Sequence, residues 1–275
     1  MADHLQHERA ILFSSGYAAN ISLLGAISKR HDVIAADKLV HASIIDGLTL
    51  ARAKYIRFPH HDFHAALKAN PSVIVTESVF SMEGDITPLN QLLELSKDKP
   101  IKTIVDTAHS FGLLETPIAT FTITPLGKTM ASMGAIISGK HDDIELVLQK
   151  ARAYHYSTAL PPAIAHANLT ALHILQQETW RKATLQHLID YFIKAADERN
   201  IPLMNKDRTP IKTILIQDNE KTMRIKNRLL TDGFFIGGIR PPTVPLHTAR
   251  LRISLSALHN EQQITALLDI LATLL

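Results

Sequence analysis

Two stretches, Ile101-Lys-Thr-Ile-Val-Asp-Thr-Ala-His109 and Ile123-Thr-Pro-Leu-Gly-Lys-Thr-Met130, decide how this chain is interpreted. The first predicts a buried strand that ends in Asp106, with His109 close behind, and the second predicts a strand followed by Lys128. Neighbouring strand ends meet at one edge of a parallel sheet. Pyridoxal phosphate needs a lysine amine for its aldehyde, held as a Schiff base, and a carboxylate that keeps its pyridine nitrogen protonated. From these residues alone, a loop lysine and an ordinary strand-end aspartate are the commoner interpretation.

Outward from these stretches, the hydrophobic pattern alternates between helices and short apolar strands. Helices are predicted over residues 17–29, 42–53 and 88–98. Strands are predicted over residues 33–36, 72–77, 101–106, 121–124 and 135–138. This alternation predicts the α/β class, with a mostly parallel sheet that has helices on both faces.

The pattern changes after Pro161-Pro162, where two long helical stretches follow at residues 163–177 and 179–199. Beyond them we expect strands over 211–216, 234–239 and 250–257 and helices over 219–231 and 260–274. We therefore expect a large domain over residues 1–175 and a small C-terminal α+β domain over residues 176–275. A chain of 275 residues is long enough to bury a core in each.

Composition excludes several classes of protein. The 46% hydrophobic and 20% charged content is that of a folded globular protein. The net charge of +3 is small and the basic residues are scattered, so we expect no nucleic-acid partner. Without cysteine there can be no disulfide and no thiolate catalysis. No apolar run has membrane-spanning length and residues 1–7 do not read as a signal peptide, so we expect a cytoplasmic protein with no membrane contact.

Five further segments share their residues and their order with one family. They are Phe13-Ser-Ser-Gly-Tyr-Ala-Ala-Asn20, Val40-His-Ala-Ser43, Thr76-Glu-Ser-Val-Phe-Ser-Met-Glu-Gly-Asp85, Tyr156-Ser-Thr158 and Ile239-Arg-Pro-Pro-Thr-Val-Pro245. From about residue 8 onward the chain resembles the α-oxoamine synthases, fold-type I pyridoxal phosphate enzymes that condense an amino acid with an acyl thioester and release carbon dioxide. The last segment is most similar to the branch that joins L-alanine to a pimeloyl thioester in biotin biosynthesis, rather than to branches that use glycine or serine.

The resemblance implies three catalytic residues, Lys128, His41 and Asp106. Lys128 would hold the cofactor and then remove the α-proton of the substrate. Asp106 would bind the pyridine nitrogen and His109 the phenolic oxygen of the cofactor. His41 would stack on the ring and contact the substrate. A capping or surface histidine and a buried aspartate with a structural partner are the alternatives for His41 and Asp106.

The start of the first predicted helix is a candidate phosphate site, and the resemblance places Gly16 and Tyr17 there against the cofactor. Gly16 and Tyr17 precede or begin a predicted helix, whose N-terminus favours an anion. Thr124, four positions before Lys128, could bind the phosphate, whereas many relatives have their threonine three positions before the lysine. Ser157 and Thr158 would reach the cofactor of a second subunit, which makes a homodimer the expected assembly. A plain turn at Gly16 and a helix-start cap at Ser157 are the alternatives.

Further residues would line the cofactor and the substrates. Glu77 and Ser81 are expected at the same sheet edge as Asp106. Arg252 would grip the carboxylate of the amino acid through its guanidinium fork. Arg250 faces the same side of the predicted strand, so the choice between the two arginines depends on the resemblance. Thr243 would contact the acyl substrate.

The run His60-His61-Asp62-Phe63-His64 suggests a metal site only at first sight. Adjacent histidines in a strand point apart, and no motif nearby offers a carboxylate ligand. We therefore expect no metal.

Some parts of the chain depart from the family pattern. Relatives carry a segment before the counterpart of Met1, including an arginine and a glycine-rich stretch near the active site, and their connection from Asp106 to Lys128 is longer. The expectation is that amino-acid binding survives these changes better than acyl transfer. A non-catalytic or truncated protein of the same fold, serving as the partner subunit of an active relative, is the alternative function.

Overall fold

The computed structural model describes all of residues 1–275, which form two compact units. Unit 1 consists of Met1–Val79 and Thr87–Gln177. Unit 2 consists of Phe80–Ile86 and Glu178–Leu275. No helix in either unit combines the length and the apolar character needed to cross a membrane.

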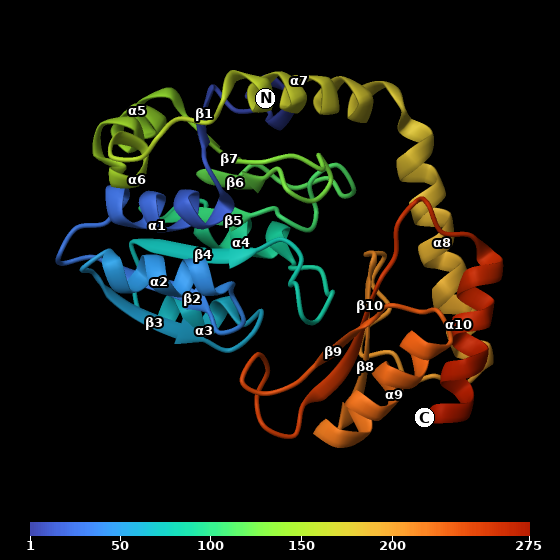
Figure 1. Ribbon diagram of the computed structural model, residues 1–275. Coiled ribbons are helices and arrows are strands. Elements are labelled where there is room, and N and C mark those ends of the chain that lie inside the picture. Colours follow the sequence, from blue (N-terminus) through green and yellow to red (C-terminus); the bar gives the residue numbers. More distant parts are fainter. The chain divides into compact units, whose positions relative to one another are not determined.

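Unit 1 is built on one sheet of seven strands in the order β1-β7-β6-β5-β4-β2-β3 (Figure 1). The strands are β1 (Arg9–Phe13), β2 (Val33–Asp37), β3 (Lys54–Phe58), β4 (Val73–Glu77), β5 (Lys102–Asp106), β6 (Phe121–Pro125) and β7 (Ala135–Gly139). Strands β2 to β6 pair in parallel, whereas β7 runs antiparallel to both β6 and β1. The predicted mostly parallel sheet is confirmed, and the edge strands β1 and β3 are additions to the prediction.

Helices cover both faces of this sheet (Figure 1). They are α1 (Gly16–Ile27), α2 (Ala42–Leu50), α3 (Phe63–Lys68), α4 (Leu89–Ser96), α5 (His141–Lys150), α6 (Arg152–His155) and α7 (Pro162–Gln177), with a 3₁₀ turn at Asp3–Leu5. Helices α3 and α4 pack against the strands through Phe63 and Leu92. Helix α1 packs on α2 and contacts β6 and β7. Helices α3, α5 and α6 were not predicted from the sequence.

Unit 2 has an antiparallel sheet in the order β8-β10-β9. Its elements are α8 (Thr179–Glu198), β8 (Ile211–Gln217), α9 (Asn219–Thr231), β9 (Gly237–Ile239), β10 (Ala249–Ser254) and α10 (Glu261–Leu274). The three helices and the sheet share one apolar core, to which Phe192, Leu251 and Leu268 contribute. This is the α+β arrangement that the alternation of apolar runs predicts.

The segment Phe80–Ile86 groups with unit 2, although the sequence analysis assigned it to a first domain spanning residues 1–175. Its polar groups explain this. The guanidinium of Arg250 forms an ion pair with Glu83 at 2.9 Å, and the Thr213 hydroxyl donates to the Glu83 carbonyl at 3.1 Å. Gly84 has φ of +77°, and a Cβ there would lie 2.4 Å from the carbonyl oxygen of Ile211. Only glycine therefore permits this close approach.

Candidate active site

The carboxyl ends of neighbouring strands in unit 1 bring two acidic residues together. Glu77 ends β4 and Asp106 ends β5, and the parallel register sets them side by side. Both side chains belong to residues that are almost fully buried, at 3% and 4% exposure. Asp106 is also the register partner of Ile123 in β6. The predicted gathering of Glu77 and Asp106 at one sheet edge is what the structure has.

Asp106 is held by neutral hydrogen-bond donors. Its Oδ2 accepts from the side-chain amide of Asn20 at 2.9 Å, and its Oδ1 accepts from the backbone N–H of Ala108 at 2.9 Å. Burial raises the pKa of the Asp106 carboxyl, while these two hydrogen bonds and the charges of Lys128 and His41 act to lower it. The site is therefore a desolvated carboxyl group that lacks a cation in hydrogen-bond contact.

Lys128 follows β6 at a distance of three residues, so it lies in the turn beyond the strand. Its carbonyl accepts from the backbone N–H of Ala131 at 3.0 Å, which closes the turn. The side chain is exposed, and its positive charge acts to lower the pKa of Asp106. His109 lies in the turn after β5, where it is half-buried. The amine and the carboxylate are thus at the same edge of unit 1.

His41 is the N-cap of α2, as the alternative interpretation had it. Its Nδ1 accepts from the backbone N–H of Ser43 at 3.2 Å and lies 2.8 Å from the Ser43 hydroxyl. The backbone N–H of His41 donates to Glu77 at 2.5 Å. Capping and a contact with the cofactor are compatible, because capping uses only Nδ1 and leaves the face of the exposed ring open.

The start of α1 has the features of an anion site. Ser15 caps the helix by accepting from the N–H of Ala18 at 3.1 Å. A Cβ on Gly16 would lie 2.8 Å from the ring of Pro125, so the glycine lets the helix start pack on the end of β6. Tyr17 is 48% exposed and its hydroxyl donates to Asp46. Gly16 therefore has a packing role whatever it binds.

The other two predicted phosphate elements differ in exposure. Thr124 is fully buried, with its hydroxyl 3.0 Å from that of Thr107. Ser157 and Thr158 are exposed. The Ser157 hydroxyl donates back to the carbonyl of Ala153 at 2.5 Å, so it closes the end of α6 and does not cap the start of α7.

Three predicted residues belong to unit 2. Ser81 lies in the segment Phe80–Ile86, and its carbonyl accepts from Nε of Arg252 at 2.6 Å. The Nη1 of Arg252 donates to Ser254 at 2.9 Å. Thr243 is exposed in the loop after β9, with its N–H donating to the Arg240 carbonyl at 3.1 Å. Arg250 reaches the same segment as Arg252 through Glu83, which agrees with the prediction that both face one side.

Asn20 and Ser43 were quoted within motifs but were not predicted as site residues. Both are buried polar side chains on helices that flank the sheet edge. A polar residue among apolar ones on a predicted helix, at Asn20 in Tyr17-Ala-Ala-Asn20, is the signal that sequence reasoning could have used.

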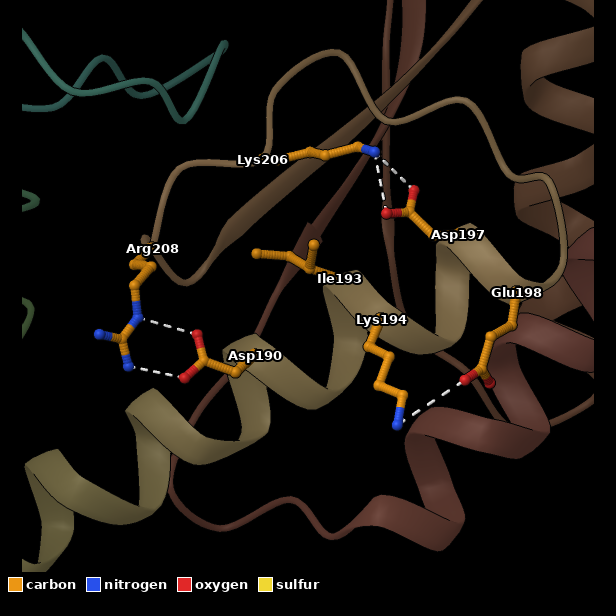
Figure 2. Close-up of a pocket in the computed structure, with 7 residues that line it drawn as sticks. All are labelled: Asp190, Ile193, Lys194, Asp197, Glu198, Lys206 and Arg208. Carbon is orange, nitrogen blue, oxygen red and sulfur yellow. Dashed lines mark hydrogen bonds and ion pairs between the residues drawn. The ribbon is translucent and has the colours of Figure 1, made fainter.

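A hollow of about 480 Å³ in unit 2 contains none of the predicted residues (Figure 2). It lies between α8 and the loop before β8, and its charged groups pair with one another. Asp190 pairs with Arg208 at 2.6 Å and Asp197 pairs with Lys206 at 2.8 Å. Its lining therefore carries acidic and basic side chains in pairs, with no excess of one sign.

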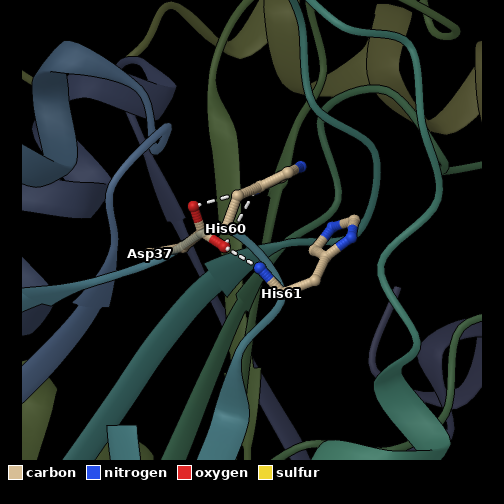
Figure 3. A group of neighbouring side chains, drawn as sticks. All are labelled: Asp37, His60 and His61. Carbon is tan, nitrogen blue, oxygen red and sulfur yellow. Dashed lines mark hydrogen bonds and ion pairs between the residues drawn. The ribbon is translucent and has the colours of Figure 1, made fainter. Parts of the chain in front are cut away.

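The histidine run differs from the sequence interpretation. His60 and His61 lie in the turn after β3, not in a strand, and their rings stack with centroids 3.7 Å apart (Figure 3). Asp37, at the end of β2, supplies the carboxylate that was thought to be missing, and potential ligand atoms of all three residues lie within 4.8 Å of one another. The reason given for expecting no metal was therefore wrong.

The geometry of this cluster is that of a hydrogen-bonded link. Nδ1 of His60 lies 3.0 Å from both oxygens of Asp37, and the N–H of His61 donates to Asp37 at 2.9 Å. The cluster ties the turn after β3 to the end of β2.

Asp37→Asn should destabilise unit 1 by about 1–3 kcal/mol at pH 7. Both oxygens of the Asp37 carboxylate now accept hydrogen bonds, and in the variant an amide nitrogen would face one of these donors instead. Burial of Asp37 acts to raise its pKa, but the bonds from His60, His61 and Leu39 outweigh burial and lower it. Because the pKa of Asp37 is lower in the folded protein, the charged carboxylate stabilises the fold at pH values above the pKa of unfolded Asp, about 3.9. This stabilisation is lost as the pH falls through the pKa of Asp37 in the folded protein. Denaturant unfolding should therefore show the difference from the unaltered protein shrinking below about pH 4. Asp98→Asn, at an exposed position, is the control, and an equal loss there would contradict the role.

These residues fit pyridoxal phosphate. The buried Asp106 carboxyl is bonded only to neutral donors, so a protonated ring nitrogen would supply the compensating charge. An exposed lysine lies at the same edge, beside a glycine-containing helix start. The fold and this site define a fold-type I pyridoxal phosphate enzyme.

Comparison with known proteins agrees. Residues 1–271 match the family Aminotransferase class I and II. An 8-amino-7-oxononanoate synthase of Saccharophagus degradans is 39% identical over 96% of this chain and 71% of its own length. The crystal structure of an 8-amino-7-oxononanoate synthase from Francisella tularensis has a TM-score of 0.88 and 36% identity, covering 99% of this chain and 84% of that one. A Sphingomonas wittichii serine palmitoyltransferase has a TM-score of 0.93 at 25% identity, covering 99% and 73%.

The chain belongs to the class I and II aminotransferase family, within its group of 8-amino-7-oxononanoate synthases. Its cofactor is pyridoxal phosphate.

Proposed function

We propose that the chain condenses L-alanine with a pimeloyl thioester to form 8-amino-7-oxononanoate, carbon dioxide and the free thiol. The observation that carries this proposal is the similarity of almost the whole chain to synthases of that name, at 39% identity for the relative from Saccharophagus degradans. The alternative of a non-catalytic partner subunit has no comparable support, because the lysine, aspartate and histidine needed for the chemistry are all present.

Pyridoxal phosphate supplies an aldehyde that binds amines covalently and a protonated ring that withdraws electrons from the α-carbon of the substrate. In the proposal, Lys128 holds the aldehyde and then removes the α-proton as a general base. Asp106 accepts the hydrogen bond of the ring nitrogen and keeps it protonated. The desolvated position of Asp106 supports this role, since a charge–charge contact is strongest where water is excluded.

The other unit 1 residues are proposed to hold the cofactor in place. His41 stacks on the ring and contacts substrate, and its capping bond to Ser43 supports a fixed orientation for the imidazole. His109 binds the phenolic oxygen, and Glu77 lies close to the reacting centre beside Asp106. Gly16 and Tyr17 bind the phosphate at the start of α1, supported by the capped helix terminus.

Several contacts in the proposal are less direct. Thr124 is proposed to lie on the phosphate side of the cofactor. Its buried hydroxyl contacts the hydroxyl of Thr107. Ser157 and Thr158 complete the phosphate site of a second copy in a homodimer, which their exposure permits. Ser81 contacts the cofactor.

The substrate contacts in unit 2 are also proposals. Arg252 binds the carboxylate of alanine with the guanidinium N–H groups that its bonds to Ser81 and Ser254 leave over, which are both on Nη2 and the second one on Nη1. Thr243 contacts the acyl chain from its exposed loop.

The test is a product assay with the purified chain, pyridoxal phosphate, L-alanine and a pimeloyl thioester. Carbon dioxide release and 8-amino-7-oxononanoate, identified by mass spectrometry, should appear together in equal amounts. Glycine, L-serine and a palmitoyl thioester serve as matched alternatives, each expected to be used at least about tenfold less well. Faster turnover of an alternative pair, or no product from any pair, would reject the proposal.

A further inference from the structure

Asn20 lies at the centre of a buried polar network that connects two of the proposed site residues. It is 2% exposed and lies within α1. Its amide nitrogen donates to Oδ2 of Asp106 at 2.9 Å and to Oγ of Ser43 at 3.0 Å. Both N–H bonds of the amide are thus used on polar groups from two other elements, the start of α2 and the end of β5.

The network continues from Asn20 through Ser43 to His41. The backbone N–H of Ser43 donates to Nδ1 of His41, so Nδ1 is an acceptor. The Ser43 hydroxyl accepts from Asn20 and lies 2.8 Å from Nδ1 of His41. The contacts therefore run from Asn20 through Ser43 to His41. The network sets the position of the His41 ring.

The amide oxygen of Asn20 shows why the side chain has this orientation. Its Oδ1 is buried and has no hydrogen-bond partner. A buried acceptor without a partner is destabilising, since it has lost its hydrogen bonds to water. Rotating the amide by half a turn would remove the donors from Asp106 and Ser43 and place an oxygen against a carboxylate oxygen. The amide keeps this orientation because its nitrogen then faces two acceptors, the Ser43 hydroxyl and a carboxyl oxygen of Asp106.

We propose that Asn20 is a positioning residue of the active site, which holds the Asp106 carboxyl group by a hydrogen bond that favours its charged form and orders His41 through Ser43. The role in catalysis depends on the proposed function of Asp106 and His41. The effect on Asp106 itself does not, because it follows from contacts within the chain.

The physical basis is the opposition between burial and hydrogen bonding at Asp106. Burial favours the neutral carboxyl and raises its pKa, and the Asn20 bond favours the charged form. A neutral carboxyl could not compensate the charge of a protonated ring nitrogen. If Asn20 served only to fill space, replacing it would leave the protonation of Asp106 unchanged. The protonation of Asp106 therefore distinguishes a packing role from the proposed positioning role.

The experiment follows the titration of Asp106 in the full-length chain by infrared spectroscopy with ¹³C-labelled aspartate. The Asp106 band is assigned by its loss in Asp106→Asn. In Asn20→Leu, which has a similar volume, the titration midpoint should rise by about one to two pH units. Asn20→Ala should shift it in the same direction and serves if the leucine variant does not fold.

Ser22→Ala is the matched control, because Ser22 lies on the same helix, is also buried and has no bond to Asp106. Its midpoint should stay within about 0.3 units of the unaltered value, well below the effect of a charge-assisted hydrogen bond. An unchanged midpoint in folded Asn20 variants, or an equal shift in Ser22→Ala, would overturn the inference. If the midpoint shifts as expected while the alanine and pimeloyl assay yields nothing, the proposed function fails and the effect of Asn20 stands.

Discussion

Lys128→Ala should abolish turnover of L-alanine and a pimeloyl thioester, with kcat falling by at least about 1,000-fold. The variant loses both the amine that holds the cofactor and the general base, and a positioned base alone contributes about 10²–10⁴-fold. Lys128 lies in the turn after β6 and its charge acts on Asp106. Steady-state kinetics give the loss, and borohydride reduction with peptide mapping should label Lys128 in the unaltered protein.

Lys150→Ala is the control for this substitution, since Lys150 is an exposed residue in the last turn of α5. It should keep its activity and its borohydride label. If Lys128→Ala retains more than about a tenth of the original kcat, far above the loss expected for a missing base, another group performs this step. A label on a different lysine would have the same meaning.

Asp106→Asn should slow the exchange of the α-proton of L-alanine by about 100-fold or more. An amide keeps the size of the side chain but cannot hold a proton on the ring nitrogen, and preorganised electrostatic contacts of this kind contribute about 10²–10³-fold. Cofactor affinity should fall far less, because the phosphate and the aldehyde keep their contacts. Exchange is followed by NMR in D₂O and affinity by absorbance titration.

The comparison of the two losses is the decisive part of this experiment. Equal losses of exchange and affinity would mean that Asp106 only supports binding, and unchanged values would remove it from the site. Asp142→Asn, at the exposed start of α5, should leave both measurements unchanged.

The buried strands of unit 1 were predictable because each one is a short run of consecutive apolar residues. Runs such as Ile101–Asp106 have a continuous apolar centre, and they became β4 to β7 with shifts of one residue at their ends. Strand β3 was missed because Lys54 and Arg57 interrupt its pattern at an exposed sheet edge. Strand β1 pairs only with β7, which lies far from it in the sequence, so a local pattern could not reveal its partner.

The candidate site shows the same division. The order of strand ends predicted that Glu77 and Asp106 lie side by side. The histidine turn was misjudged, because its geometry depends on a left-handed residue at His61, with φ of +60°, and on the distant carboxylate of Asp37. A strand pattern applied to a turn gave the wrong directions for both rings.

The amino-acid sequence by itself determined the class of the fold, the alternation of its elements and the chemical groups at the strand ends, since these depend on spacing within short windows. The tertiary structure alone decided that Asn20 bonds Asp106, that Ser43 connects it to His41, and that Phe80–Ile86 belongs with unit 2. The physical reason is that a buried polar group must find a partner, and that partner is chosen by which distant segments the folded core brings within hydrogen-bond distance.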